Sequence, residues 1–114
     1  MSKKTDSARL RFALAKIDDL QRYQARFPTL EALFQDAMAL DAVLMCLLQI
    51  GETLPKVENK SWASQLPVQG TSSLRNIIAH NCEGVDFASI ERVVTEFIPP
   101  LRETILKCLA EAGT

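Results

Sequence analysis

The sequence predicts an all-α domain with four principal helices, the last of them bent. Apolar residues recur at helical spacing over long stretches, and no stretch of useful length alternates as a strand does. Prolines and glycines divide the chain into helix-sized pieces. With 114 residues and 47% hydrophobic content, residues 1–114 are expected to form a single domain around one modest core.

The first helix is expected from Ser7 to Arg26. Its inward face carries apolar residues at helical spacing, namely Leu10, Ala13, Leu14, Ile17 and Leu20. Pro28 should end it, because proline has no backbone N–H and clashes with the preceding turn. Thr29 is then a favourable N-cap for the next helix.

A second helix is expected to continue from Leu30 to about Leu54. One stripe along it contains Leu30, Leu33, Phe34, Ala37, Leu40, Leu44 and Leu48. Another face, which is neither strongly polar nor part of this stripe, carries Met38, Ala42, Met45 and Gln49. That face suits a dimer seam or a surface covered by the following loop, and the sequence does not choose between them.

Residues 55–70 are predicted to form a polar loop in which Trp62 pins the chain to the bundle, although its indole could instead stack on a base. A third helix is expected over residues 73–83, and Gly84 should end it.

Asp86 should cap the fourth helix. The expected inner stripe of that helix contains Phe87, Ile90, Val93, Val94 and Phe97. Pro99-Pro100 should kink or break it before a final stretch from Leu101 to Ala112.

The stretch Arg75-Asn76-Ile77-Ile78-Ala79-His80 holds the chain's only histidine. In a helix, Arg75 and His80 would lie at the two edges of one polar face, with the small Ala79 leaving space between them for a phosphate. Such a pair suits RNA cleavage, because histidine can transfer a proton near neutral pH and a guanidinium can stabilise charge on phosphorus. The 2′-hydroxyl of RNA supplies the nucleophile, so no metal is needed.

Other interpretations of this stretch are less informative but have to be weighed. A lone histidine near a helix end is commonly a solvated residue or a C-terminal cap. One histidine and three scattered cysteines without a Cys-x-x-Cys pair cannot build an ordinary zinc site, so no metal site is predicted. A nucleophilic pair of Cys82 with His80 is also weak, because the helical pattern turns Cys82 towards the core.

Asp41 falls inside the apolar stripe of the second helix, where an unpaired charge would be costly. It either orients Arg75 or His80, or lies at a partly wet edge of the stripe, and both interpretations stay open.

Two segments resemble the HepT-like branch of the HEPN superfamily. Arg75 to Asp86 is similar to the family pattern of Arg-Asn, a few apolar residues, His, any residue, Tyr, and a Gly-x-Asp turn. Asp41-Ala42-Val43, followed by Gln49-Ile50-Gly51-Glu52, resembles the end of the family's second helix. Trp62 lies between the two segments as it does in the family, and the resemblance spans roughly residues 8 to 109.

The resemblance implies a HEPN-type antiparallel four-helix bundle with a kinked or broken last helix. It also implies an endoribonuclease toxin whose partner is a MntA-like nucleotidyltransferase antitoxin. Arg75 and His80 would be the catalytic pair, and Asn76 would help to shape the site. Family members usually form homodimers in which two motifs face one cleft. The resemblance implies no cofactor.

The chain departs from the family pattern at Cys82, which stands where the family has tyrosine. That tyrosine accepts AMP from the antitoxin and thereby silences the toxin, so AMP transfer at this position is in doubt, whereas direct binding by the partner stays open. Met45 and Cys46 also replace the Arg and Asn that relatives often carry. A second RNA contact on this helix is therefore weakened.

Composition limits the remaining function classes. Thirteen basic and fourteen acidic side chains argue against a protein that grips nucleic acid through many phosphates. A local patch could still form from the basic residues Lys3, Lys4, Arg9, Arg11, Lys16 and Arg75. A solvated helix face is the favoured interpretation of the first five.

Three cysteines without pairing signals suggest free thiols in a reducing cytoplasm, with Cys46 and Cys108 as core residues. No signal peptide and no membrane span are expected, so a cytoplasmic protein without a membrane partner is predicted.

Two functions from different classes therefore compete. The first is the metal-independent endoribonuclease, with His80 as general acid or base and Arg75 as ligand of the phosphate and transition state. The second is a non-catalytic helical module that binds a nucleotidyltransferase-fold protein and helps it to hold substrate.

Overall fold

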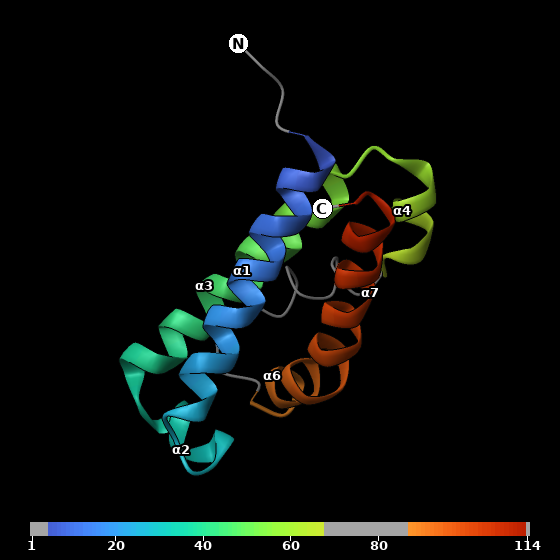
Figure 1. The fold of residues 1–114 in the computed structure, drawn as a ribbon. Coiled ribbons are helices and arrows are strands. Elements are labelled where there is room, and N and C mark those ends of the chain that lie inside the picture. The colour runs from blue at the N-terminus through green and yellow to red at the C-terminus, as the bar shows by residue number, and fades with distance from the viewer. Residues whose placement is uncertain (1–4, 68–86, 114) are drawn as a thin grey trace.

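A computed structural model describes residues 5–67 and 87–113 of the chain. Within these ranges every regular element is helical, which confirms the predicted fold class (Figure 1). The elements in order are α1 (Asp6–Ala25), α2 (Leu30–Gln35), α3 (Ala37–Thr53), a 3₁₀ turn (Leu54–Lys56), α4 (Lys60–Gln65), α6 (Phe87–Arg92), a π-helix (Val93–Phe97) and α7 (Ile98–Glu111). Helix α1 contacts both α3 and α7, and both run antiparallel to it.

Helix α1 has nearly the bounds that the sequence predicts. The Thr5 hydroxyl accepts a hydrogen bond from the Ala8 N–H at 3.1 Å and so begins the helix. Four apolar side chains of the predicted face, Leu10, Ala13, Ile17 and Leu20, are fully buried. The helix ends at Arg26, ahead of Pro28.

The expected continuous second helix is wrong, because the chain breaks at Asp36 into α2 and α3. Thr29 caps α2 as predicted, through a 3.1 Å bond from the Ala32 N–H to its hydroxyl. Asp36 has an extended backbone, and its carboxylate accepts the Ala39 N–H at 2.9 Å. Aspartate competes with the helical backbone for such bonds and therefore favours the start of a helix over its interior.

The break changes which face of α3 is buried. Its core residues are Val43, Cys46, Leu47, Ile50 and Gly51, whereas the predicted stripe is only half-buried at Leu40, Leu44 and Leu48. Ala37 and Asp41 are exposed, so Asp41 does not lie inside a buried stripe.

Helix α3 is also unusually apolar. Together with the 3₁₀ turn, residues Ala37–Lys56 are long and apolar enough to cross a membrane, and they are the one such candidate in the described chain. The expectation that no stretch approaches a membrane span is therefore wrong on length and composition. A single helix of this kind is weak evidence for a span, because core helices of soluble proteins pass the same test.

The expected loop after α3 contains a helix of its own. The Asn59 side chain caps α4 by accepting the Trp62 N–H at 3.1 Å. Trp62 is 7% exposed, so the interpretation that it pins this segment to the bundle is confirmed. With its side chain in the core, the indole has little surface on which a base could stack.

The last helix is interrupted as predicted, although the irregular turn lies just ahead of the prolines. In the π-helix the Ile98 N–H bonds to the Val93 carbonyl, five residues back. Pro99 and Pro100 have no N–H to donate to the turn before them, and their rings crowd its carbonyls. A wider turn relieves this crowding.

Phe87, the first residue of α6, is an exception to the predicted inner stripe because it is 42% exposed. Its ring stacks on that of Phe34 from α2, with centroids 5.1 Å apart and planes 8° from parallel. The rest of the stripe is in or against the core.

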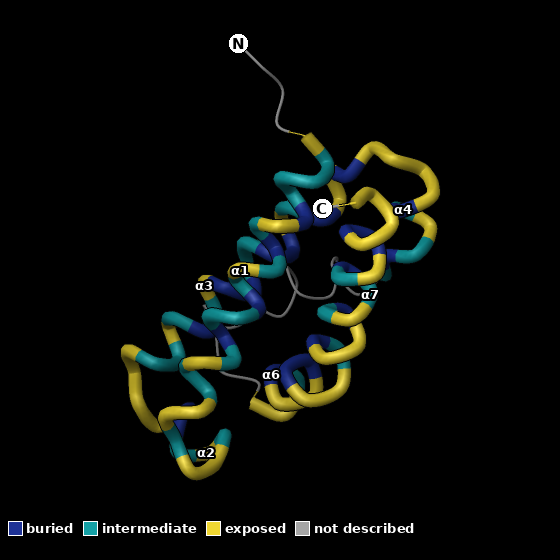
Figure 2. The backbone as a smooth tube through the Cα atoms, viewed as in Figure 1, coloured by how far each residue is buried: buried dark blue, intermediate teal, exposed yellow. Residues whose placement is uncertain are grey.

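The buried side chains form one cluster where α1, α3 and α7 face one another (Figure 2). An ion pair from Arg102 on α7 to Asp18 on α1, 2.9 Å between Nε and Oδ1, joins these helices at the edge of the core. The expected helix over residues 73–83, its end at Gly84 and the cap at Asp86 lie outside the described residues.

Candidate functional site

The predicted catalytic motif belongs to the part of the chain that the structure does not describe. Arg75, Asn76, His80 and Cys82 all fall within residues 68–86. Their roles therefore stay predictions. The structure describes the helices that come before and after this segment in the chain.

The two described elements that flank the motif are each held by an aromatic side chain. On one side, α4 is fixed by the buried Trp62. On the other side, α6 begins with Phe87 stacked on Phe34 and continues with the fully buried Ile90. Helix α4 lies near the start of α1 and the end of α7, whereas α6 lies near α2 at the opposite end of the molecule (Figure 1).

Asp41, the predicted supporting carboxylate, lies on the exposed side of α3. Its exposure agrees with the interpretation that it lies at a wet edge of the helix. Because the carboxylate is not buried, it does not require a charged partner. Contacts to Arg75 and His80 are outside the described residues, so the supporting role stays a prediction. Met45 on the same helix is 52% exposed, whereas Cys46 is 4% exposed.

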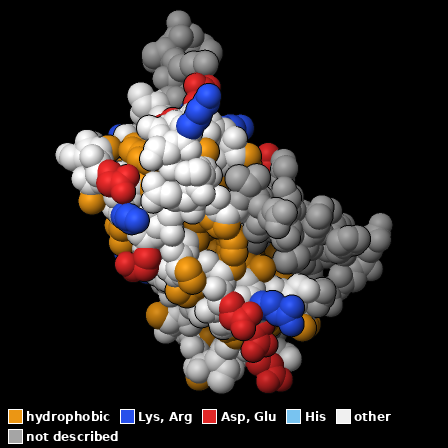
Figure 3. Space-filling model, turned by 90° about the vertical axis from the view of Figure 1, so that its right-hand side faces the viewer, with side chains coloured by type: hydrophobic (Ala, Val, Ile, Leu, Met, Phe, Trp, Pro, Cys, Tyr) orange, Lys and Arg blue, Asp and Glu red, His pale blue; other side chains and the backbone are white. Residues whose placement is uncertain are grey.

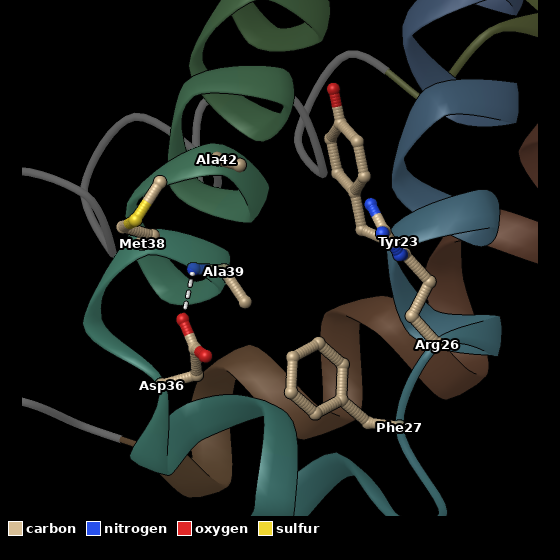
Figure 4. A pocket seen from close by; sticks show the side chains of 7 residues that line it. All are labelled: Tyr23, Arg26, Phe27, Asp36, Met38, Ala39 and Ala42. Atoms are coloured by element: carbon tan, nitrogen blue, oxygen red, sulfur yellow. Dashed lines mark hydrogen bonds between the residues drawn. The ribbon is translucent and has the colours of Figure 1, made fainter.

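A cavity that the sequence analysis missed lies between the end of α1 and the start of α3 (Figure 4). Its volume is about 380 Å³, and it is lined by Tyr23, Arg26, Phe27, Asp36, Met38, Ala39 and Ala42. The first three residues come from the α1 side and the other four from the α3 side. The break at Asp36 positions the α3 side of the cavity. The expectation of one continuous helix through Asp36 therefore could not have led to the cavity.

The cavity combines aromatic surface with two groups of opposite charge. Tyr23 and Phe27 are partly buried and pack against the core, so their rings are held in place. Arg26 is exposed and makes no ion pair with any described residue. Asp36 uses Oδ1 to cap α3, and within the described chain its Oδ2 makes no hydrogen bond. A pocket of this kind suits a small flat molecule with a charged end.

The candidate basic patch on the first helix does not stand out as a binding surface. Arg9 pairs with Asp6 at 2.9 Å, and Lys16 pairs with Asp19 at 3.6 Å. Only Arg11, of the described members of this patch, lacks a carboxylate partner. On the α7 side of the molecule, which Figure 3 presents, basic and acidic side chains are likewise interleaved. These observations favour the solvated helix face.

The two described cysteines are core residues, as predicted. Cys46 and Cys108 are 4% and 0% exposed, and both thiols are free. Burial raises the pKa of each thiol, and the nearby Asp19 raises the pKa of Cys46 further. Neither cysteine is therefore suited to act as a nucleophile.

A comparison with known protein families decides the classification. The family described as ribonuclease HepT-like matches residues 13–108. The chain belongs to the HepT-like family. The comparisons with curated proteins and with solved structures found no match.

The HepT-like match runs from α1 to α7 and includes the motif from Arg75 to His80. It confirms the resemblance seen in the sequence, and the all-α bundle is consistent with a HEPN-type fold. Family membership supports nuclease activity at the level of the HepT-like family. It says nothing about the cavity between α1 and α3.

Proposed function

We propose that this HepT-like protein is a metal-independent endoribonuclease that acts as the toxin of a toxin–antitoxin pair. The observation that carries the proposal is the HepT-like ribonuclease match over residues 13–108, which includes the chain's only histidine and an arginine five residues before it. Arg75 and His80 are the proposed catalytic residues, with Asn76 and Asp41 in support.

In the proposed reaction, RNA supplies its own nucleophile. His80 accepts the proton of the 2′-hydroxyl, whose oxygen attacks the adjacent phosphorus while the bond to the 5′-oxygen breaks. The leaving oxygen takes a proton from an imidazolium, which a second His80 provides where two motifs face one cleft. Arg75 stabilises the charge on the phosphoryl oxygens. The products are a 2′,3′-cyclic phosphate and a 5′-hydroxyl.

The proposed partners follow from the same family. They are a MntA-like nucleotidyltransferase antitoxin, the RNA substrate and a second copy of the chain, with no membrane partner and a cytoplasmic location. Because Cys82 stands where the family tyrosine accepts AMP, we propose that the antitoxin neutralises this protein by direct binding.

The test is incubation of purified protein with total cellular RNA in EDTA, followed by mapping of fragment ends. The wild type should produce cyclic phosphate and 5′-hydroxyl ends, and His80→Ala and Arg75→Ala should lose at least a hundredfold in rate. Arg92→Ala is a matched control, because the Arg92 side chain is 80% exposed and its one ion pair within the described residues is a 3.8 Å contact with Glu96. Fluorescence of the buried Trp62 should confirm that each variant is folded.

The role of Asp41 has a separate test. A double-mutant cycle of Asp41→Asn and Arg75→Ala should show coupling in cleavage rate if Asp41 orients the arginine. Additive losses would remove Asp41 from the site and leave the catalytic pair in place.

Cys82 favours a second candidate function, the non-catalytic module that binds a nucleotidyltransferase-fold protein. Loss of the acceptor tyrosine is expected in a chain that no longer has an activity to silence. Intact RNA after incubation with folded wild type, together with a stable complex with such a partner, would establish this alternative over the nuclease.

A further inference from the structure

The cavity between α1 and α3 has opposite charges on its two walls. Arg26 lies on the α1 wall, and Asp36 lies on the α3 wall (Figure 4). Four of the other described arginines pair with a carboxylate, namely Arg9, Arg22, Arg92 and Arg102. Arg26 and Arg11 have no such partner among the described residues, and of these two it is Arg26 that lines the cavity, where its guanidinium can bind an anion.

Between these charges the cavity surface is largely apolar. Tyr23 and Phe27 supply rings from the α1 side, and both pack against the core, so little side-chain entropy is lost when a ligand contacts them. Ala39 and Ala42 face them with small side chains. Met38, 84% exposed, lies at the rim, where its flexible side chain can adapt to an occupant.

We propose that this cavity binds a single guanosine nucleotide of RNA. The base packs against the rings of Tyr23 and Phe27, and the phosphate pairs with Arg26, as aromatic and arginine side chains bind single-stranded RNA elsewhere. Asp36 accepts hydrogen bonds from the base through Oδ2. Guanine fits this carboxylate because its N1–H and N2–H donors lie side by side, whereas uracil offers one donor between two acceptors.

The size and polarity of the cavity support a nucleotide as the occupant. A volume of about 380 Å³ lies in the range of small-molecule sites. A nucleotide has an anionic phosphate for Arg26, a flat base for the two aromatic rings, and hydrogen-bond donors on the edge of that base for Asp36. An apolar side chain of a partner protein would fill the middle but leave both charges desolvated without partners.

Each charged residue also has a structural role, which the test has to separate from binding. Arg26 caps the end of α1, where a cation interacts favourably with the helix dipole. Asp36 caps the start of α3. Because asparagine is an equally good N-cap, Asp36→Asn keeps the cap, removes the negative charge and replaces the second acceptor oxygen with an NH2 donor.

The test uses two natural reporters in the full-length protein. Tyr23 is the chain's only tyrosine and Trp62 its only tryptophan, so fluorotyrosine and fluorotryptophan each give one fluorine NMR signal. Titration with millimolar GMP should shift the Tyr23 signal and leave that of the distant, buried Trp62 unchanged. UMP should bind about tenfold more weakly, because it offers the Asp36 carboxylate one donor where guanine offers two, and a lost hydrogen bond to a charged group costs about that factor.

Matched variants assign the contacts. Arg26→Ala should weaken GMP binding about tenfold, because it removes a charge-assisted contact to the phosphate. Arg22→Ala, one turn earlier on α1 and paired with Asp19, should change it by less than about twofold. Asp36→Asn should abolish the preference for GMP over UMP, because its amide offers one acceptor and one donor and no longer matches two adjacent donors of guanine.

Three results would overturn the proposal. They are a Tyr23 signal that GMP does not move, equal losses in Arg26→Ala and Arg22→Ala, and a Tyr23 signal that moves only with an acidic peptide, which would assign the cavity to protein docking. The inference rests on the proposed nuclease for its relevance to RNA, yet GMP cannot be cleaved by that chemistry. Binding of GMP without RNA cleavage would refute the proposed nuclease function alone. RNA cleavage without GMP binding would refute the proposed nucleotide site alone.

Discussion

Removing the Asp6 carboxylate should destabilise the folded protein by about 2 kcal/mol, because this one side chain ties the start of α1 to the start of α4. Its Oδ1 accepts the Glu58 N–H at 3.0 Å, and its Oδ2 accepts the Asn59 N–H at 2.7 Å. The Arg9 guanidinium donates to Oδ1 at 2.9 Å. The Asp6 side chain is 17% exposed, and its two backbone hydrogen bonds lie near the surface.

The magnitude follows from the two backbone bonds. A hydrogen bond to a charged group contributes roughly 1.5–3 kcal/mol when it is buried, and these two lie near the surface, where about 1 kcal/mol each is reasonable. The pair with Arg9 is three residues along the same helix and adds only about 0.3 kcal/mol. Asp6→Ala removes all three contacts and leaves two N–H groups without their partner.

The contribution of the Asp6 carboxylate to folding stability should disappear in acid. Burial by itself raises the pKa of Asp6, but the hydrogen bonds from Glu58, Asn59 and Arg9 together lower it below the ordinary value of 3.8. A pKa that is lower in the folded protein means that the ionised carboxylate stabilises the fold. Stability relative to the neutral variant Asp6→Asn should therefore be fully present above about pH 4 and be lost as the pH falls through the lowered pKa.

Urea denaturation followed by Trp62 fluorescence measures the effect. With a urea dependence of about 2 kcal/mol/M, Asp6→Ala should lower the midpoint by about 1 M with an unchanged slope. Asp19→Ala is the control on the same helix. Among the described residues Asp19 forms ion pairs with Lys16 and Arg22 alone, so the substitution should cost about 0.5 kcal/mol. A loss in Asp6→Ala no larger than in Asp19→Ala would refute the reasoning.

Other perturbations test the core and the surface. Ile105→Ala should cost about 3 kcal/mol in urea denaturation, because the side chain is fully buried, and a loss below about 1 kcal/mol would mean that its site collapses or is mispacked. Met38→Gln should change stability by less than about 0.5 kcal/mol, because the side chain is 84% exposed; a larger loss would show that α3 is covered in solution. Cys108 should react with a thiol reagent only at the rate of unfolding, because burial hides the thiol and raises its pKa, and fast labelling of native protein would contradict its packing.

Much of the fold follows from local signals in the sequence. Thr29 acts as the predicted cap of α2, and Thr5, which the sequence analysis did not single out, caps α1 in the same way. Pro99-Pro100 predicts the interruption of the last helix. These signals act within one turn of the chain, so they hold without knowledge of the tertiary packing.

The break at Asp36 could not be predicted with the same ease. The stretch around it is apolar on more than one side, so a stripe through Leu40 and Leu44 is as regular as the observed one through Val43 and Leu47. Only packing against α1 selects between them. Asp36 caps α3, but the apolar pattern continues on both sides of it.

The functional features, like the fold, include one that local sequence signals predict and one that they do not. The Arg75 and His80 motif is visible because its residues are neighbours in sequence, and its recognition agrees with the HepT-like match. The cavity was invisible because Arg26 and Asp36 come from different helices, and their approach depends on the break between α2 and α3.

Helix α2 has a consequence for how the protein moves. It spans six residues between Thr29 and Asp36, and a helix that short does not persist in water by itself. Its order depends on Leu33 and Phe34 in the core and on the stacking of Phe34 against Phe87 of α6. Amide hydrogen exchange within α2 should therefore become faster when the contact between Phe34 and Phe87 of α6 is lost, although more than fifty residues of chain separate the two helices.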